Sequence, residues 1–359
     1  MARLNTSNYA TTTKHNLRSN KTTSIYNDVI SQDHFNEVWI ESQKYLTPEL
    51  ASTSTPYVYH WGSLNTKPKA IIFCIHGLTI HGFAYNGIGN YLAKHGYLVI
   101  CADQHGFGRF YANPDKNLKD PSLKYYEVLN DFEPLVEKLH KLYPDTKIFC
   151  MGESTGGHLT IRFGSLHPEL FSGLIISSAS MKTKIPKFPL LISTGGQMLF
   201  HPLSEINLTK FIGSTMSENP KTVVERMHDP LGRNFLSIEE ISKYLYLSAK
   251  TKPYVAKIKP TMPVLILQGD IDSIYVPTGS KAIAKSLKST DKTLKMLPKC
   301  GHVLLETSYI NPLTAQSVLN WLNQHVENDL TKNITKDENI TSNSIGEDNK
   351  NLKEGEKND

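Results

Sequence analysis

Short apolar runs that alternate with segments of helical periodicity constrain the fold of this chain more than any other feature. Each run is five or six residues long, and its continuous hydrophobicity is typical of a strand buried on both faces. The six runs are Ala70–Ile75, Tyr97–Ala102, Lys147–Met151, Gly173–Ser178, Pro263–Gln268 and Thr293–Leu297. Helices are predicted at Asn86–His95, Tyr126–Leu142, Thr155–His167, Ser280–Leu287 and Pro312–Val326. This order predicts an α/β fold with a mostly parallel, doubly wound sheet.

An earlier pair of segments, Phe35–Tyr45 and Thr55–Trp61, is predicted to add antiparallel strands at one edge of that sheet. The two ends of the chain, 1–30 and 328–359, are rich in Asn, Thr, Ser and Lys and poor in large apolar side chains. Such segments do not bury enough surface to offset their ordering entropy, so both are predicted to be disordered. The folded domain is expected to span residues 31–327.

The alternation stops between about 182 and 260, where proline-rich and helical pieces replace it. We interpret this stretch as a helical cap insertion, because active sites of open α/β sheets lie at the carboxyl ends of the strands and an insertion there covers the site. Its apolar residues are predicted to bind substrate, as the wall of an acyl tunnel or a membrane-facing lip. They are Phe188, Leu190, Leu191, Met198, Leu199 and Phe200. The alternative is that they form only a core of the cap itself.

The run Gly152-Glu153-Ser154-Thr155-Gly156 lies between a predicted strand and a predicted helix. This spacing is typical of the sharp turn that presents a nucleophilic serine, and the two glycines keep the tight turn free of side-chain clashes. A serine hydroxyl near neutral pH needs a base within hydrogen-bond reach and an acid that orients the base. Ser154 is therefore the candidate nucleophile.

The later sequence supplies both partners in the expected order. His302 follows the last predicted strand, where a loop can place an imidazole over the serine. Two aspartates, Asp270 and Asp272, follow the preceding strand. We choose Asp272 as the acid and keep Asp270 as the alternative. The ordinary role of an aspartate here would be to form a turn.

Acyl transfer also needs two N–H donors directed at the developing oxyanion. The backbone of Thr155, directly after the serine, is expected to supply one. The second is expected from the loop His76-Gly77-Leu78-Thr79 after the first predicted strand of the sheet, with Leu78 as the donor. His76 is expected to orient this loop rather than to act as a base.

Together these motifs resemble the α/β-hydrolase superfamily, and within it the branch of monoacylglycerol lipases and lysophospholipases of the serine aminopeptidase S33 type. The resemblance covers residues 35–326. Its further carriers are Asp103–Gly108, Asp229-Pro230-Leu231 and Gly301-His302. It implies the α/β-hydrolase fold, Ser154, Asp272 and His302 as catalytic triad, and the backbone of Leu78 and Thr155 as oxyanion hole. The chain departs from the family at Thr155, where methionine or alanine is usual.

The resemblance implies hydrolysis of a carboxylic ester with one acyl chain, a monoacylglycerol or a lysophospholipid, through an acyl-serine intermediate. Three alternatives remain open: an aminopeptidase of the S33 type, an acyltransferase on the same fold, and a ligand-binding protein without catalysis. The aminopeptidase would need acidic cap residues to hold the α-amine of its substrate. Such residues are present at Glu205, Glu218, Glu225, Glu239 and Glu240.

Charge and composition narrow the partners. The net charge of +5 combines a tail of −4 over residues 327–359 with a body of +9, which suits peripheral contact with an anionic membrane surface. Basic residues do not alternate with aromatic ones, so nucleic acid is not an expected partner. No cofactor and no metal are predicted. Without a signal peptide or an apolar stretch of membrane-spanning length, we expect a cytoplasmic protein with possible peripheral membrane contact through the cap.

Overall fold

A computed structural model describes residues 32–125, 127–182, 203–209 and 216–326. Both ends predicted to be disordered, 1–30 and 328–359, lie outside the described residues. So do the six apolar cap residues between Phe188 and Phe200.

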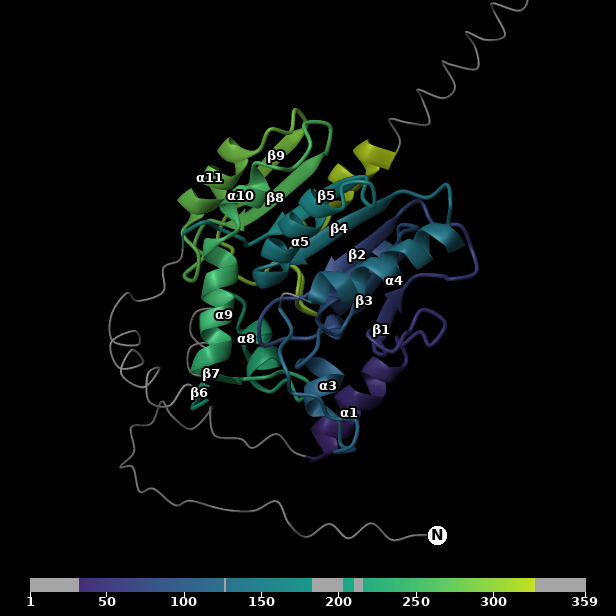
Figure 1. Ribbon diagram of the computed structural model, residues 1–359, viewed down its shortest axis with the longest axis vertical. Coiled ribbons are helices and arrows are strands. Elements are labelled where there is room, and N and C mark those ends of the chain that lie inside the picture. Colours follow the sequence, from purple (N-terminus) through teal and green to yellow (C-terminus); the bar gives the residue numbers. More distant parts are fainter. Residues whose placement is uncertain (1–31, 126, 183–202, 210–215, 327–359) are drawn as a thin grey trace, which may run out of the picture.

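A seven-stranded sheet forms the centre of the molecule (Figure 1), in the order β1-β3-β2-β4-β5-β8-β9. Strand β1 pairs antiparallel with β3, and every other neighbouring pair is parallel. The strands are β1 Val58–Trp61, β2 Ile71–Ile75, β3 Leu98–Ala102, β4 Ile148–Glu153, β5 Gly173–Ser177, β8 Val264–Gly269 and β9 Lys292–Leu297. The predicted mostly parallel sheet and its six apolar strands are confirmed.

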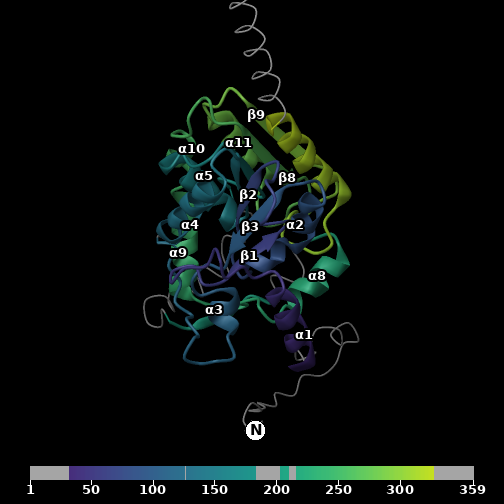
Figure 2. The same ribbon diagram turned by 90° about the vertical axis from the view of Figure 1, so that its right-hand side faces the viewer.

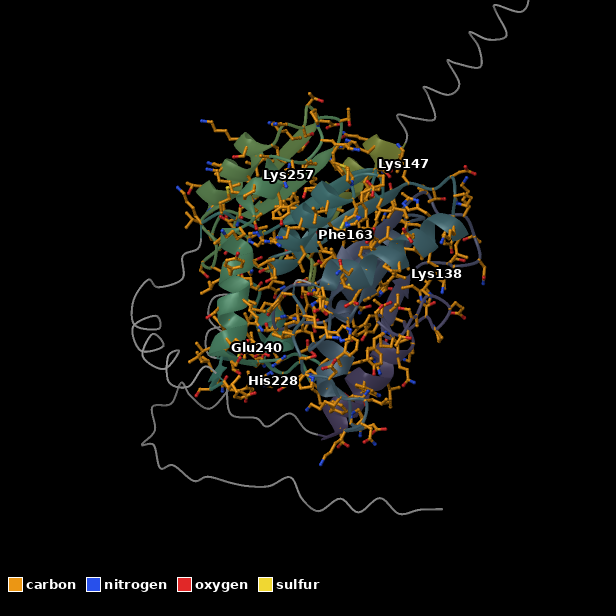
Figure 3. All side chains as sticks on the ribbon, in the orientation of Figure 1. Lys138, Lys147, Phe163, His228, Glu240 and Lys257 are labelled. Atoms are coloured by element: carbon orange, nitrogen blue, oxygen red, sulfur yellow. The ribbon has the colours of Figure 1, made fainter. Side chains whose placement is uncertain are left out.

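Two apolar layers cover the two faces of the sheet, because successive strand residues point to opposite sides. On one face Ile71 and Phe73 pack with α4 (Val128–Leu142), α5 (Thr155–Leu166) and α11 (Pro277–Ser286). Phe163 of α5 lies over the middle of the sheet on this face (Figure 3). On the other face Ile72 and Cys74 pack with α2 (Asn86–Ala93) and the helix at 312–326 (Figure 2). The doubly wound α/β-hydrolase architecture is thus observed.

The prediction of an edge strand at Phe35–Tyr45 is wrong, because this segment forms helix α1, Gln32–Gln43. Phe35 and Trp39, one helical turn apart, stack with their ring centroids 5.6 Å apart. The guanidinium of Arg109 lies 3.9 Å from the Trp39 ring centroid and donates to the Trp39 carbonyl oxygen at 2.7 Å. These contacts need helical spacing, and apolar content alone did not reveal it. The companion strand is found, as β1.

The chain between β5 and β8 contributes nothing to the seven-stranded sheet. We call its described residues, 203–209 and 216–260, the cap segment. Its elements are β6 Glu205–Asn207, α8 Pro220–Met227, β7 Phe235–Ser237, α9 Ile238–Ala249 and α10 Lys252–Val255, with β6 and β7 paired in a sheet of their own. In Figure 1 α8, α9 and this small sheet lie to one side of the main sheet, where Figure 3 labels Glu240 and His228.

Parallel register brings the loops that matter to one edge of the sheet. Ile75 at the end of β2 pairs with Gly152 of β4, and Gly152 pairs with Ile176 of β5. Gly269 at the end of β8 pairs with Leu297 at the end of β9. The segments that follow these strands therefore emerge side by side, at the carboxyl edge where open α/β sheets place their sites.

Candidate active site

A sharp turn between β4 and α5 holds Ser154 in a backbone conformation that L-residues rarely adopt, with φ 56° and ψ −117°. A Cβ atom at Gly156 would lie 1.9 Å from the carbonyl oxygen of Ile75, and one at Gly152 would lie 2.3 Å from that of Gly156. Backbone atoms cannot swing aside as a side chain can, so both positions require glycine. The local sequence thus produces the strand, turn and helix that present the serine.

The loops after β4, β8 and β9 join Ser154, Asp272 and His302 in one hydrogen-bonded chain. His302 Nε2 lies 3.0 Å from Ser154 Oγ, and His302 Nδ1 lies 3.0 Å from Asp272 Oδ2. With its proton on Nδ1, the imidazole donates to Asp272 and accepts the hydroxyl of Ser154. The structure brings the three predicted residues together in the arrangement that activates a hydroxyl.

The carboxylate of Asp272 is fully buried and saturated with donors. Its Oδ1 accepts the backbone N–H groups of Ile274 and Tyr275 at 2.8 and 2.9 Å, and Oδ2 also accepts Gln268 Nε2 at 2.8 Å. Burial raises the pKa of Asp272, but the charge of His302 and these hydrogen bonds outweigh it and hold the pKa below its usual value. An ionised acid is therefore kept beside the base.

The same pair shifts the base in the opposite direction. Burial lowers the pKa of His302, yet the neighbouring Asp272 carboxylate outweighs burial and raises the pKa above its usual value. Asp270, the alternative acid, is exposed. Geometry therefore favours Asp272 over Asp270 for the predicted role.

The predicted oxyanion loop adjoins the nucleophile. A Cβ placed on Gly77 would lie 3.4 Å from Ser154 Cβ, so the chain at Leu78 passes beside the serine. Thr155 is the first residue of α5, where a backbone N–H finds no partner within the helix. The structure therefore places both predicted donors, Leu78 and Thr155, around the serine.

Buried His76 supports this loop. Its Nδ1 donates to the Gly77 carbonyl oxygen at 2.9 Å, while Nε2 accepts the Gln104 backbone N–H at 3.0 Å. Burial lowers the pKa of His76 to about 3. A neutral imidazole with both nitrogens occupied orients the loop and is not available as a base.

Two residues near the triad were not assigned to the site from the sequence. Tyr244 of α9 is buried with its hydroxyl against that of Tyr275, and hydrogen bonding to Tyr275 and to the nucleophile turn opposes the rise that burial causes in its pKa. Tyr275 in turn lies 5.4 Å from His302, centroid to centroid. The only sequence signal for Tyr244 was the amphipathic pattern of α9. Contacts made across the cap segment leave no local signature.

Glu153, before the serine, is a fully partnered acid. It accepts Ser177 Oγ at 2.6 Å and the backbone N–H groups of Leu304, Leu305 and Glu306 at 3.0 Å each. Burial is the largest influence on its pKa and raises it above the usual value. Glu153 thus ties the nucleophile turn to the loop that carries His302.

Within residues 32–125, 127–182, 203–209 and 216–326, no group of three or more His, Cys, Asp or Glu side chains is placed to hold a metal ion. Across the same ranges, no helix combines the length and apolarity needed to cross a bilayer.

Residues 66–308 match the family described as serine aminopeptidase, S33. The chain belongs to this family. Its relatives include monoglyceride lipase of Mus musculus, 27% identical over 281 residues, which cover 78% of this chain and 89% of the mouse protein. Monoglyceride lipase of Homo sapiens is 26% identical over 259 residues, covering 72% and 83%. The resemblance stated from the motifs is confirmed.

Solved structures share the fold. Monoacylglycerol lipase of Paleococcus ferrophilus superposes with a TM-score of 0.61 at 24% identity, over 75% of this chain and 98% of the other. A soluble variant of monoglyceride lipase from Saccharomyces cerevisiae, in complex with a substrate analog, gives 0.63 at 23% identity, over 75% and 91%. The α/β-hydrolase fold of the chain is confirmed.

Proposed function

We propose that the protein is a serine hydrolase of carboxylic esters with a single acyl chain, of the monoacylglycerol type. One observation carries the proposal: the continuous chain from Ser154 Oγ through His302 to Asp272, at 3.0 Å for each link. The monoglyceride lipases among the relatives of the chain support the substrate class.

In this proposal Ser154 Oγ attacks the ester carbonyl and passes its proton to His302 Nε2. The N–H groups of Leu78 and Thr155 bind the oxyanion, and Asp272 stabilises the imidazolium without taking its proton. His302 then gives the proton to the leaving alkoxide, which departs as the alcohol. Water, activated by His302 in turn, hydrolyses the acyl-Ser154 ester and releases the fatty acid.

The acidic residues of the cap segment argue against the aminopeptidase alternative, because four of the five are already engaged. Glu218 accepts the Gly301 backbone N–H at 2.7 Å, and Glu225 accepts Thr307 Oγ1 at 2.6 Å. Glu240 pairs with Arg233 at 2.7 Å and Glu239 with Lys243 at 2.8 Å. A carboxylate held by such partners is a poor receptor for the amine of a substrate.

Apolar residues around the oxyanion loop support an acyl-chain substrate. Leu78 packs against a buried cluster that joins Phe107 of the body to Leu236 and Tyr244 of the cap segment. Val303, directly after His302, packs with Met216 and Tyr275 in a second cluster. An apolar lining of this kind favours a long acyl chain, since each methylene moved out of water contributes about 0.8 kcal/mol.

The wider organisation belongs to the same proposal. We infer one hydrolase domain over 31–327 with a cap insertion over 182–260, and a cytoplasmic enzyme that contacts membranes peripherally through the cap. The basic body supports attraction to anionic headgroups. Hydrolysis and acyl transfer would use the same residues, and the acceptor distinguishes them.

Labelling with a fluorophosphonate tests the proposed function. We expect stoichiometric labelling of wild-type protein at Ser154 and none in Ser154→Ala, because only this serine has a base and an oxyanion site beside it. Hydrolysis of 1-monooleoylglycerol, followed as released oleate, should disappear in the same variant. Labelling or oleate release that persists in Ser154→Ala would falsify the proposal.

A further inference from the structure

A second buried acid, Glu306, lies four residues after His302 and touches the oxyanion loop from behind. Its Oε1 accepts the backbone N–H of Gly77 at 2.6 Å, the shortest reach between the loop after β9 and the loop after β2. Gly77 directly precedes Leu78, the proposed oxyanion donor. The side chain of Glu306 is 4% exposed, so water does not compete for this hydrogen bond.

The same carboxyl group also adjoins the nucleophile turn. A Cβ built on Gly77 would lie 3.1 Å from Glu306 Oε2 and 3.4 Å from Ser154 Cβ. Gly77 is therefore held between the acid and the serine. Any shift of Glu306 would move the peptide that leads into Leu78.

The surroundings of Glu306 favour a neutral carboxyl. Burial is the main cause that raises its pKa well above the usual value, and the nearby Glu153 adds to the rise. Arg226 of α8 and the Gly77 N–H oppose it. What the site preserves is thus the acceptor oxygen rather than a free negative charge.

We propose that Glu306 is a positioning residue that aligns the Leu78 N–H with the developing oxyanion by anchoring Gly77, so that the loop bearing the base and the loop bearing the donor are held as one unit. This inference rests on the proposed function. Oxyanion donors act only within a narrow range of geometry, and loss of one costs about 10²–10³-fold in kcat. A donor displaced by a fraction of an ångström costs part of that factor.

Three substitutions separate the acceptor from the charge and the volume of the side chain. Glu306→Gln keeps an oxygen at the same distance from Gly77. Glu306→Asp keeps the carboxyl but withdraws it by one methylene, and Glu306→Leu removes the acceptor at similar size. We measure kcat and KM with p-nitrophenyl butyrate, the inhibition constant of a trifluoromethyl ketone whose adduct carries the oxyanion, and the thermal midpoint.

We expect kcat to fall about 10–100-fold in the Leu and Asp variants with KM within about twofold, and to stay within about threefold of wild type in the Gln variant. The ketone should weaken by the same factor as kcat. Wild-type kcat in the Leu variant, or a Gln variant as impaired as the Leu variant, overturns the proposal. If Glu306→Leu does not fold, Glu306→Asp decides: unchanged kcat there is equally fatal.

Glu225→Leu is the matched control, because Glu225 holds the same loop at Thr307 and Ser308 but has no contact with Gly77 in the described residues. We expect its kcat and ketone affinity to stay near wild type. Equal losses in Glu225→Leu and Glu306→Leu would reduce Glu306 to loop stability alone. Turnover that survives Ser154→Ala instead counts against the proposed function, independently of these comparisons.

Discussion

The carboxylate of Glu153 accepts the backbone N–H of Leu304 at 3.0 Å, across 151 positions of sequence. Glu153 directly precedes the nucleophile, and Leu304 follows the base by two residues. This hydrogen bond therefore sets the spacing of Ser154 and His302 through the backbone as well as through their own side chains.

Removing this acid should cost stability and activity together. In Glu153→Ala three buried N–H groups, at Leu304, Leu305 and Glu306, lose their acceptor. We expect the free energy of unfolding to fall by about 3 kcal/mol or more. Urea denaturation measures it, with the exposed Glu137→Ala in α4 as the control. Equal stability of the two variants would contradict the anchoring role.

The raised pKa of His302 predicts the acid limb of activity. The imidazole must be neutral to accept the Ser154 proton, so kcat/KM should fall as the pH drops through the His302 pKa, with a midpoint above 6.5. The rate of fluorophosphonate labelling should follow the same curve. In Asp272→Asn the midpoint should move down, because the charge that raises this pKa is gone. A midpoint below 6.5 in wild type would refute the coupling.

Asp272→Asn and Asp270→Asn should differ strongly. Asp272 holds the base, and its loss should lower kcat about 10⁴-fold while the fold persists. Asp270 is exposed, and its substitution should change kcat less than about threefold. Steady-state kinetics with circular dichroism as a folding check decide between them. A larger loss in Asp270→Asn would identify it as the acid.

A buried pair joins the cap segment to the body. His81 Nε2 lies 2.8 Å from Asp229 Oδ2. Burial raises the pKa of Asp229, but His81 outweighs it and the net shift is downward. The pair therefore adds stability above the unfolded pKa of about 3.9, and this stability is lost as the pH falls through the lower folded value.

We expect Asp229→Ala to lower the free energy of unfolding by about 3 kcal/mol at pH 7, since it leaves a buried imidazole without its partner. Below pH 3 the difference from wild type should shrink. Urea titrations between pH 2.5 and 7 measure both, with the exposed Asp115→Ala as the reference. A difference that grows on acidification would reverse the assignment.

Activity should climb with acyl length until the apolar site is filled. At about 0.8 kcal/mol per methylene, kcat/KM should rise roughly fourfold for each added CH₂. Aspartate at two of the residues Phe188, Leu190, Leu191, Met198, Leu199 and Phe200 should flatten this climb and weaken vesicle binding. Hydrolysis of p-nitrophenyl acetate is the control. Acetate activity lost in parallel would show that these residues are only cap core.

Local signals predicted the strands and the nucleophile turn because both depend on neighbouring residues. Gly152 and Gly156 are dictated by backbone atoms a few residues away or on the adjoining strand. Long-range polar contacts left no such trace. The bond between Glu306 and Gly77 spans 229 positions, and neither residue belongs to a motif that announces the other.

The error at α1 has a related cause. Its apolar residues suit a strand as well as a helix, and the deciding partner, Arg109, lies 70 positions away. The choice between Asp270 and Asp272 had the same character. Both follow one strand, and only the fold shows which of them is turned inward.

The backbone N–H groups of His302 and Val303 both donate to the carbonyl oxygen of Met216, at 3.0 and 2.9 Å. Met216 belongs to the cap segment, so the residue that would position the proton acceptor is hung partly from the piece that would select the substrate. Exchange of caps between relatives would therefore not be a modular swap of taste for one ester over another. A transplanted cap would retune the speed of the chemistry, and chimaeras would need the 216–303 junction to travel with it.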